Sequence, residues 1–405
     1  MGTLVVENIR ALYTMVGDDL GLVDDATVVC EGDAIAYAGP RKGAPPVPDD
    51  AERLDARGKA VLPGLIDCHT HLIWAGSRRD EFALRARGAS YAEIMAAGGG
   101  IRSTMRAVRT ADEDTLAKLA LPRLEALLWR GVTTVEAKSG YGLTTEDELK
   151  CLRALRRLHE IHEVDIVPTF LGAHAVPPEY EGRREDYVSV VVDEMLPAVQ
   201  EDHLADFCDV FVESGAFTVD DGRRILTRAQ ELGLGVRVHA EQLSSSGGAR
   251  LAAELGAVAA GHLEFANDDD IRLLAEAGVV CEVLSLAQVF LGMERRIPGR
   301  KLKDAGCTVA VATDLNPGSA NSADLHLAAG LSMTMCGLTA EEALLGITRN
   351  AASALRRDDI GVLAPGKRAD LVVLDSDSAY DLVYEWGQNH VARVVKNGRV
   401  LDLGE

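Results

Sequence analysis

Short apolar stretches of strand length alternate with helical stretches along the middle of the chain. We predict eight strands, at residues 61–67, 132–137, 166–171, 207–212, 235–239, 257–261, 279–284 and 308–313. Apolar residues repeat with helical spacing at residues 112–129, 146–162, 184–199 and 220–232. This alternation predicts an α/β fold, a (β/α)8 barrel of the TIM type. An open, doubly wound sheet is the alternative, but its dinucleotide-binding version lacks support because no G-x-G-x-x-G motif follows any of these strands.

Both ends of the chain favour strands and turns instead of helices. The expected strands lie at residues 3–8, 25–31, 34–38, 370–374 and 391–396, and the pair Asn397-Gly398 is typical of a hairpin turn. The chain of 405 residues also exceeds the length of about 250 to 300 residues at which one core stops growing. We therefore expect a barrel at residues 61–358 and one small β-sandwich domain built from residues 1–60 and 359–405.

The net charge of −21 limits the classes of partner. A negative field repels phosphate backbones and anionic lipids, so neither nucleic acid nor a membrane surface is expected as a partner. A small anionic substrate is compatible with this charge if a local arginine binds it.

The cysteines and the N-terminus favour a cytoplasmic protein. Seven cysteines occur, which is an odd number, and no C-x-x-C pair is present, so buried free thiols are expected in place of disulfides. The first ten residues do not have the pattern of a secretory signal. No apolar run reaches the roughly 18 residues of a transmembrane helix.

Two histidines follow the first predicted barrel strand. Residues at positions i and i+2 of an extended chain point to the same side, so His69 and His71 can direct two imidazoles at one point. That point lies at the carboxyl end of the strand, where barrel enzymes place their sites. A single His-x-His pattern is a surface or core pair of histidines roughly nine times in ten, so a metal site at this pair needs further support from the sequence.

Three later strands supply that support. His239, His262 and Asp314 each follow or end an apolar strand, at the same end of the strand as the first two histidines. A buried carboxylate without a partner is very costly, and a metal ion would be such a partner. Each residue alone could be a satisfied core or rim residue. Together they indicate a metal and proton-transfer site.

Several motifs resemble a known group of hydrolases. Residues 62–71 (LPGLIDCHTH) resemble the signature of the amidohydrolase superfamily, and residues 365–374 (PGKRADLVVL) resemble a strand of its C-terminal sandwich. Within that superfamily, the sequence is similar to the imidazolonepropionase family over essentially its whole length. The more specific stretches are residues 136–143 (EAKSGYGL), 169–174 (TFLGAH), 239–242 (HAEQ) and 313–319 (TDLNPGS).

The resemblance implies a site residue by residue. The implied metal ligands are His69, His71, His239 and Asp314. The implied substrate contacts are Arg78, Tyr141, His174, Gln242, Asn316, Gly318 and Ser319. Position 319 is often threonine in the family, and serine keeps the hydroxyl group. The family pattern implies one zinc or iron ion, and nitrogen and oxygen ligands accept both. Glu213 lies where some relatives place a metal-bridging residue, which leaves a second metal open, and a homodimer is expected by resemblance alone.

The implied reaction is hydrolysis of the ring amide of 4-imidazolone-5-propanoate to N-formimidoyl-L-glutamate, a step of histidine degradation. A metal such as Zn²⁺ can lower the pKa of its water to about 7. Asp314 is expected to accept the proton of the water, and His262 to stabilise the oxyanion or to relay a proton to the leaving nitrogen. The guanidinium of Arg78 suits the propanoate tail.

Two other functions would use parts of the same pattern. Another cyclic amidohydrolase or deaminase would keep the metal ligands but would not need Arg78, Tyr141 and His174 together. A non-catalytic barrel should have lost at least one ligand, and all of them are present. Without the resemblance, Arg78 would be interpreted as an exposed loop residue, and His174 as a histidine at the rim of the barrel.

Overall fold

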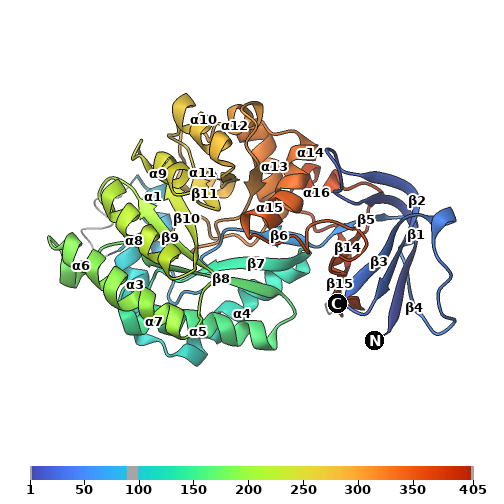
Figure 1. The fold of residues 1–405 in the computed structure, drawn as a ribbon, viewed down its shortest axis with the longest axis horizontal. Helices are drawn as coiled ribbons and strands as arrows, with labels where there is room; N and C mark the ends of the chain where they lie inside the picture. Colours follow the sequence, from blue (N-terminus) through green and yellow to red (C-terminus); the bar gives the residue numbers. More distant parts are fainter. Residues whose placement is uncertain (1, 89–98, 403–405) are drawn as a thin grey trace.

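A computed structural model describes residues 2–88 and 99–402, and its larger part is a barrel of eight parallel strands with helices on the outside (Figure 1). The strands are β6 (Leu65–Asp67), β7 (Val132–Lys138), β8 (Asp165–Ala173), β9 (Phe207–Val212), β10 (Gly235–Ala240), β11 (Ala259–His262), β12 (Val280–Val283) and β13 (Val309–Val311). They pair in chain order from β6 to β13. The predicted TIM-type barrel is confirmed.

The barrel closes between its first and last strands. Thr70 and Leu315 form a parallel bridge just beyond the ends of β6 and β13. The amide of Asp314 donates to the carbonyl oxygen of His69 at 3.0 Å, and the amide of His71 donates to the carbonyl oxygen of Leu315 at 2.9 Å. The closure therefore brings three predicted metal ligands from the two ends of the barrel sequence together.

Helices pack their apolar faces against the strands. In α4 (Glu113–Trp129), Leu116, Leu124 and Leu127 are buried, and Asp112 caps the helix by accepting from the amide of Thr115 at 2.8 Å. The other described helices are α1 (Arg79–Ala86), α3 (Ile101–Thr110), α5 (Thr145–Ile161), α6 (Arg184–Val190), α7 (Leu196–Glu201), α8 (Val219–Glu231), α9 (Gly248–Glu254), α10 (Asp268–Ala277), α11 (Ser285–Leu291), α12 (Gly299–Asp304), α13 (Leu325–Cys336), α14 (Ala340–Gly346), α15 (Arg349–Ala354) and α16 (Asp381–Tyr384). None of the helices in the described ranges is both long enough and apolar enough to cross a membrane.

The two ends of the chain form a separate mixed sheet beside the barrel (Figure 1). Its strands are β1 (Thr3–Tyr13), β2 (Leu22–Glu31), β3 (Ala34–Pro40), β4 (Glu52–Asp55), β5 (Ala60–Pro63), β14 (Leu371–Leu374), β15 (Val391–Lys396) and β16 (Arg399–Val400). The N-terminal strand β5 pairs with the C-terminal strand β14, and Leu4, Ile9, Val61, Leu371 and Val395 share one core. The small domain is therefore built from both chain ends, as predicted.

The strand predicted at residues 61–67 is wrong as a single element, because it is two strands in two sheets. The change occurs at Gly64, whose amide donates to the carbonyl oxygen of Asp370 at 2.9 Å in the small sheet. The next amide, that of Leu65, donates to the carbonyl oxygen of Gly131 at 2.9 Å beside the barrel. Both halves are buried, and the sequence signal of the switch is the pair Pro63-Gly64, which is typical of a break between strands.

Candidate metal centre and substrate pocket

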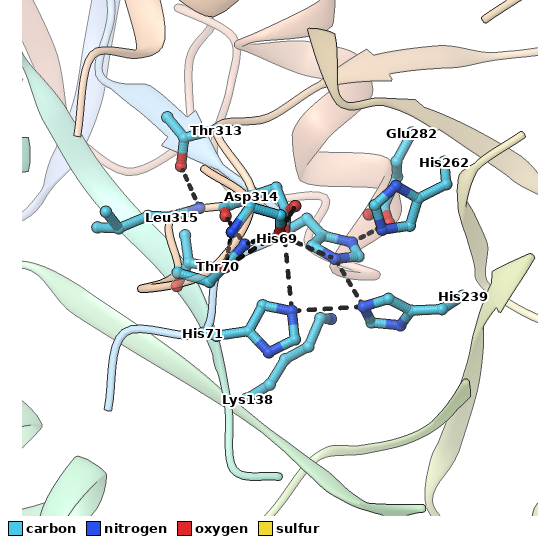
Figure 2. Close-up of polar contacts among 12 residues, drawn as sticks. His69, Thr70, His71, Lys138, His239, His262, Glu282, Thr313, Asp314 and Leu315 are labelled. Carbon is cyan, nitrogen blue, oxygen red and sulfur yellow. Dashed lines mark hydrogen bonds and ion pairs between the residues drawn. The ribbon is translucent and has the colours of Figure 1, made fainter. Parts of the chain in front are cut away.

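Four predicted ligands converge above the barrel (Figure 2). The Nε2 atom of His69 lies 3.1 Å from Nε2 of His239 and 3.8 Å from Oδ1 of Asp314. The Nε2 atom of His71 lies 3.4 Å from Nε2 of His239 and 3.5 Å from the same Asp314 oxygen. Three strand ends thus place three ring nitrogens and one carboxylate oxygen around a single point.

The donor set fits a metal ion. Ligands placed at about 2.0 to 2.1 Å around a tetrahedral ion are separated by roughly 3.3 Å, which is close to the spacing found here. All four side chains are buried, and Oδ1 of Asp314 has no hydrogen-bond partner among the described residues. Burial holds the pKa of His69 well below its ordinary value and lowers the pKa of His239 to about 4. Both imidazoles are therefore neutral, which is the form that binds metals.

A buried ion pair orients the first ligand. The Nδ1 atom of His69 lies 2.8 Å from Oε2 of Glu282, and the other oxygen of this carboxylate accepts from Arg237. Arg237 is itself buried and donates to the carbonyl oxygens of Cys68 and Ala354, at 2.7 Å each. A ligand histidine whose second nitrogen donates to a carboxylate has a fixed tautomer and ring orientation.

A second buried network lies under His239. Its Nδ1 atom lies 3.0 Å from Oδ2 of Asp209, which is also 3.1 Å from Nζ of Lys138. Lys138 donates to Glu136 at 2.8 Å, and Glu136 accepts from the amide of Thr70 at 3.0 Å. Strands β7 and β9, which lie on either side of β8, thus connect His239 on β10 to the loop that carries His69 and His71.

Sequence reasoning did not find these supporting residues. Lys138, Asp209, Arg237 and Glu282 all lie within barrel strands and are almost fully buried. The available signal was a charged residue inside or at the end of an otherwise apolar strand. A buried charge needs a partner, so such residues indicate an internal ion-pair network.

His262 ends β11 and is not one of the four residues around the common point. One of its ring nitrogens lies within 4.8 Å of donor atoms of His69 and His239, and these three histidines form a second group that could hold a metal ion. Its Nδ1 atom lies 3.7 Å from Oε1 of Glu264. Burial opposes protonation of His262, but the neighbouring Glu264 carboxylate raises the pKa of the ring above its ordinary value.

A cavity of about 1250 Å³ opens above the four ligands. All of the predicted substrate contacts line it, namely Arg78, Tyr141, His174, Gln242, Asn316, Gly318 and Ser319. His262 and Asp314 line the same cavity. The fold therefore brings the predicted metal, proton-transfer and substrate residues to one space, although they are scattered along most of the barrel sequence.

The guanidinium of Arg78 is held from two sides. Its Nε atom donates to Oε2 of Glu81 at 2.8 Å, and Glu81 also accepts from the amide of Gly100 at 3.1 Å and from the hydroxyl of Ser103 at 3.0 Å. A Cβ atom on Gly318 would lie 2.1 Å from Nη1 of Arg78. Position 318 therefore leaves room for the guanidinium only because it is glycine.

The loop after β7 places Tyr141 in the cavity. Glu148, in the first turn of α5, accepts from the amides of Gly140, Gly142 and Leu143 at 2.9, 2.8 and 2.8 Å. Nδ1 of His174 lies 2.9 Å from the carbonyl oxygen of Gly140, and the His174 ring stacks on that of His71 with centroids 5.1 Å apart. Tyr141 and His174 are thus fixed relative to His71, one of the predicted ligands.

Two predicted residues have mainly local partners. The amide nitrogen of Asn316 donates to the carbonyl oxygen of Asp314 at 2.7 Å, and its oxygen accepts from the amides of Gly318 and Ser319 at 2.8 Å each. Glu213 accepts from the amides of Ser214 and Leu243 at 2.7 and 2.8 Å. One oxygen of Glu213 therefore braces the loop after β9 and the other the loop after β10, and a second metal is not needed to explain this carboxylate.

Comparisons with known proteins agree with the architecture. The model of the amidohydrolase family matches residues 60–401. The chain is 48% identical to the imidazolonepropionase of Sphingopyxis alaskensis over 96% of both chains. It is 45% identical to that of Geobacillus kaustophilus over 99% of this chain and 98% of the relative. A zinc-bound adenosine deaminase from Xanthomonas campestris has a TM-score of 0.72 at 19% identity, covering 98% of this chain and 92% of that one, and so shares the fold alone.

Proposed function

The chain belongs to the amidohydrolase family and, within it, to the imidazolonepropionases, and we propose that it opens the ring of 4-imidazolone-5-propanoate at the site described above. The enzyme is a hydrolase of histidine degradation, and its product is N-formimidoyl-L-glutamate. The observation that best supports the proposal is the position of Arg78 in the cavity that His71, His239 and Asp314 also line. This cation matches the propanoate tail of the substrate, which a neutral ring substrate lacks.

We assign the metal site to one zinc or iron ion, held by His69, His71, His239 and Asp314. Such an ion supplies Lewis acidity at the ring carbonyl and lowers the pKa of a neighbouring water. Both metals accept imidazole and carboxylate ligands, so the supply of metal in the cell decides between them.

The protein groups then divide the proton and charge transfers. Asp314, whose Oδ1 has no hydrogen-bond partner among the described residues, takes a proton from the attacking water. The oxygen of the water adds to the carbonyl carbon, and Nε2 of His262, which carries no proton in the resting tautomer, receives the proton from Asp314. The ring C–N bond then breaks, and His262 passes this proton to the leaving nitrogen. Arg78 holds the propanoate throughout and keeps the ring over the ligands.

The direct test is to supply 4-imidazolone-5-propanoate to metal-loaded protein and to follow N-formimidoyl-L-glutamate by mass spectrometry. We expect turnover with the loaded protein, and none after chelation until metal is restored. Elemental analysis should give about one metal per chain. Full activity of the metal-free protein would overturn the metal assignment, and so would unchanged metal content after the double substitution His69→Ala/His71→Ala.

We also propose a cytoplasmic location and a homodimer with small-molecule partners. All seven cysteines are free and buried in the structure, which is typical of a reducing compartment. The dimer rests on family likeness, and light scattering of the purified protein tests it.

A further inference from the structure

One buried carboxylate near the site has no hydrogen bond. Glu264 is 1% exposed, and neither of its side-chain oxygens has a hydrogen-bond partner within the described part of the chain. The contact that stands out is with His262, whose Nδ1 lies 3.7 Å from Oε1. Buried carboxylates are normally hydrogen-bonded or paired, because removing their charge from water is costly. A contribution to the stability of the fold therefore does not explain why the carboxylate of Glu264 is buried.

The backbone between the two residues has an uncommon conformation. His262 and Leu263 have φ values of 77° and 71°, in the left-handed region that residues with side chains rarely adopt. The turn is held by the amide of Leu263, which donates to the carbonyl oxygen of Ala240 at 2.9 Å, and by the amide of Phe265, which donates to the backbone carbonyl oxygen of Glu241 at 2.8 Å. This turn places the Glu264 carboxylate beside His262. Conformations of this kind are concentrated at functional sites.

The geometry defines a role through His262. Because Nδ1 of His262 faces Glu264, Nε2 on the other side of the ring is the atom left to face the cavity, which His262 lines. A carboxylate at Nδ1 favours the tautomer with its proton on that nitrogen and holds the ring in one orientation. His69 and His239 have carboxylates at the same ring position, Glu282 and Asp209, so the arrangement recurs around the site.

We infer that Glu264 is a positioning residue that fixes the tautomer and orientation of His262 for its contact with the substrate. This deepens the proposed function and rests on it. Glu264 does not touch the four ligands in this assignment, so the metal should bind without it. It should contribute to turnover and not to stability, in contrast to a structural carboxylate.

The first test compares Glu264→Gln and Glu264→Met with wild type in metal-loaded protein. We expect kcat to fall about tenfold or more, with KM within about twofold, one metal per chain and a Tm equal to or above that of wild type.

The matched control is Asp270→Asn. Asp270 is also buried, but it accepts from the amide of Asn267 at 3.0 Å and caps α10. The control should lower Tm and leave kcat unchanged. A lower Tm or lost metal in both Glu264 variants, or an unchanged kcat, would overturn the inference.

The second test asks whether Glu264 acts through His262. In a His262→Ala background, Glu264→Gln should change kcat by less than about twofold, since residues that act as a unit are not additive. An equal loss in both backgrounds would contradict the inference.

Nitrogen-15 NMR of histidine in the zinc-loaded protein gives a readout that needs no turnover. The His262 signal, identified by its loss in His262→Ala, should show the Nδ1–H tautomer in wild type and change in Glu264→Met. An unchanged signal overturns the inference, whereas absent wild-type turnover overturns only the proposed function.

Discussion

At the scale of single residues, the proposed selectivity for an anionic substrate depends on where Arg78 is held. Glu81 occupies its Nε atom, and the missing side chain of Gly318 lets the guanidinium lie against the loop after β13. The two remaining nitrogens can then form the parallel pair of hydrogen bonds that suits a carboxylate. The net charge of the protein is −21, which repels an anionic substrate. A local cation in the cavity attracts the substrate against this repulsion.

Replacing this cation should impair recognition of the tail. We expect Arg78→Met to lower kcat/KM on 4-imidazolone-5-propanoate by roughly 30-fold or more, because losing one member of a desolvated charge pair costs about 2 to 5 kcal/mol. Metal content should not change. Arg79→Met is the matched control, since the side chain of Arg79 is 85% exposed. Wild type and Arg78→Met should differ little on an analogue without the carboxylate, and equal discrimination by both proteins would place the tail elsewhere.

His262 is a second residue whose role can be separated from metal binding. We expect His262→Ala to keep most of its metal and to lose turnover by about 100-fold or more, which is the usual scale for removing an acid–base group. The reason is that the four predicted ligands, His69, His71, His239 and Asp314, do not include it. Metal analysis and kcat measured on the same sample decide the matter: parallel loss of both would make His262 a ligand.

At the scale of elements, strand-to-helix loops place the substrate residues, and buried carboxylates hold the loops. The loop of residues 140–143 is the clearest case, since one side chain of α5 accepts from three of its amides. An isolated loop of this kind would sample many conformations. The carboxylate of Glu148 holds the loop, and with it Tyr141, in one conformation. The N-terminus of α5 favours the negative charge of this carboxylate.

Removing that carboxylate should therefore affect substrate binding and stability together. We expect Glu148→Ala to raise KM several-fold and to reduce the free energy of unfolding by about 1 to 3 kcal/mol, because backbone amides are left unpaired in a buried place. The adjacent Asp147→Ala is the control. The carboxylate of Asp147 accepts from the hydroxyl of Thr144 at the edge of the loop, at 2.7 Å, and is partly exposed. An equal rise in KM for both variants, measured by steady-state kinetics, would contradict the assigned role.

At the scale of the whole molecule, one buried lysine joins the small sheet to the barrel. Lys396 on β15 is fully buried, and its Nζ lies 2.6 Å from Asp370 and 3.1 Å from Asp165, which begins β8. The start of a barrel strand is opposite the end that carries the metal ligands. This ion-pair cluster should therefore support the assembly of the two domains and not the chemistry.

Breaking the cluster should cost stability without changing the site. We expect Lys396→Met to lower the free energy of unfolding by about 3 to 5 kcal/mol, because the buried carboxylate of Asp370 loses its cation. At temperatures well below Tm, kcat and metal content should stay at wild-type values. Arg399→Met is the control, since this exposed ion pair with Glu163 should contribute less than about 1 kcal/mol. A fall in kcat with unchanged denaturant stability would show that the small sheet acts on the site.

The sequence alone determined the barrel and the group of residues at its mouth. Strand and helix patterns are local, and parallel strands end on the same side, so polar residues that follow apolar strands must meet. His69, His239 and Asp314 could be placed together for that reason, and the family motifs added Arg78 and Tyr141.

Only the tertiary structure decided which partner each buried charge has. The contact of Lys138 with Asp209, and that of Arg237 with Glu282, join residues that are far apart in the sequence and lie on different strands. The tertiary structure also decided which sheet each half of the run at residues 61–67 joins. Local periodicity reports that a segment is buried, but the partner on the other side depends on how the barrel closes. The turn that places Glu264 beside His262 depends on backbone angles and on two hydrogen bonds to the loop after β10, which no pattern of residue types specifies.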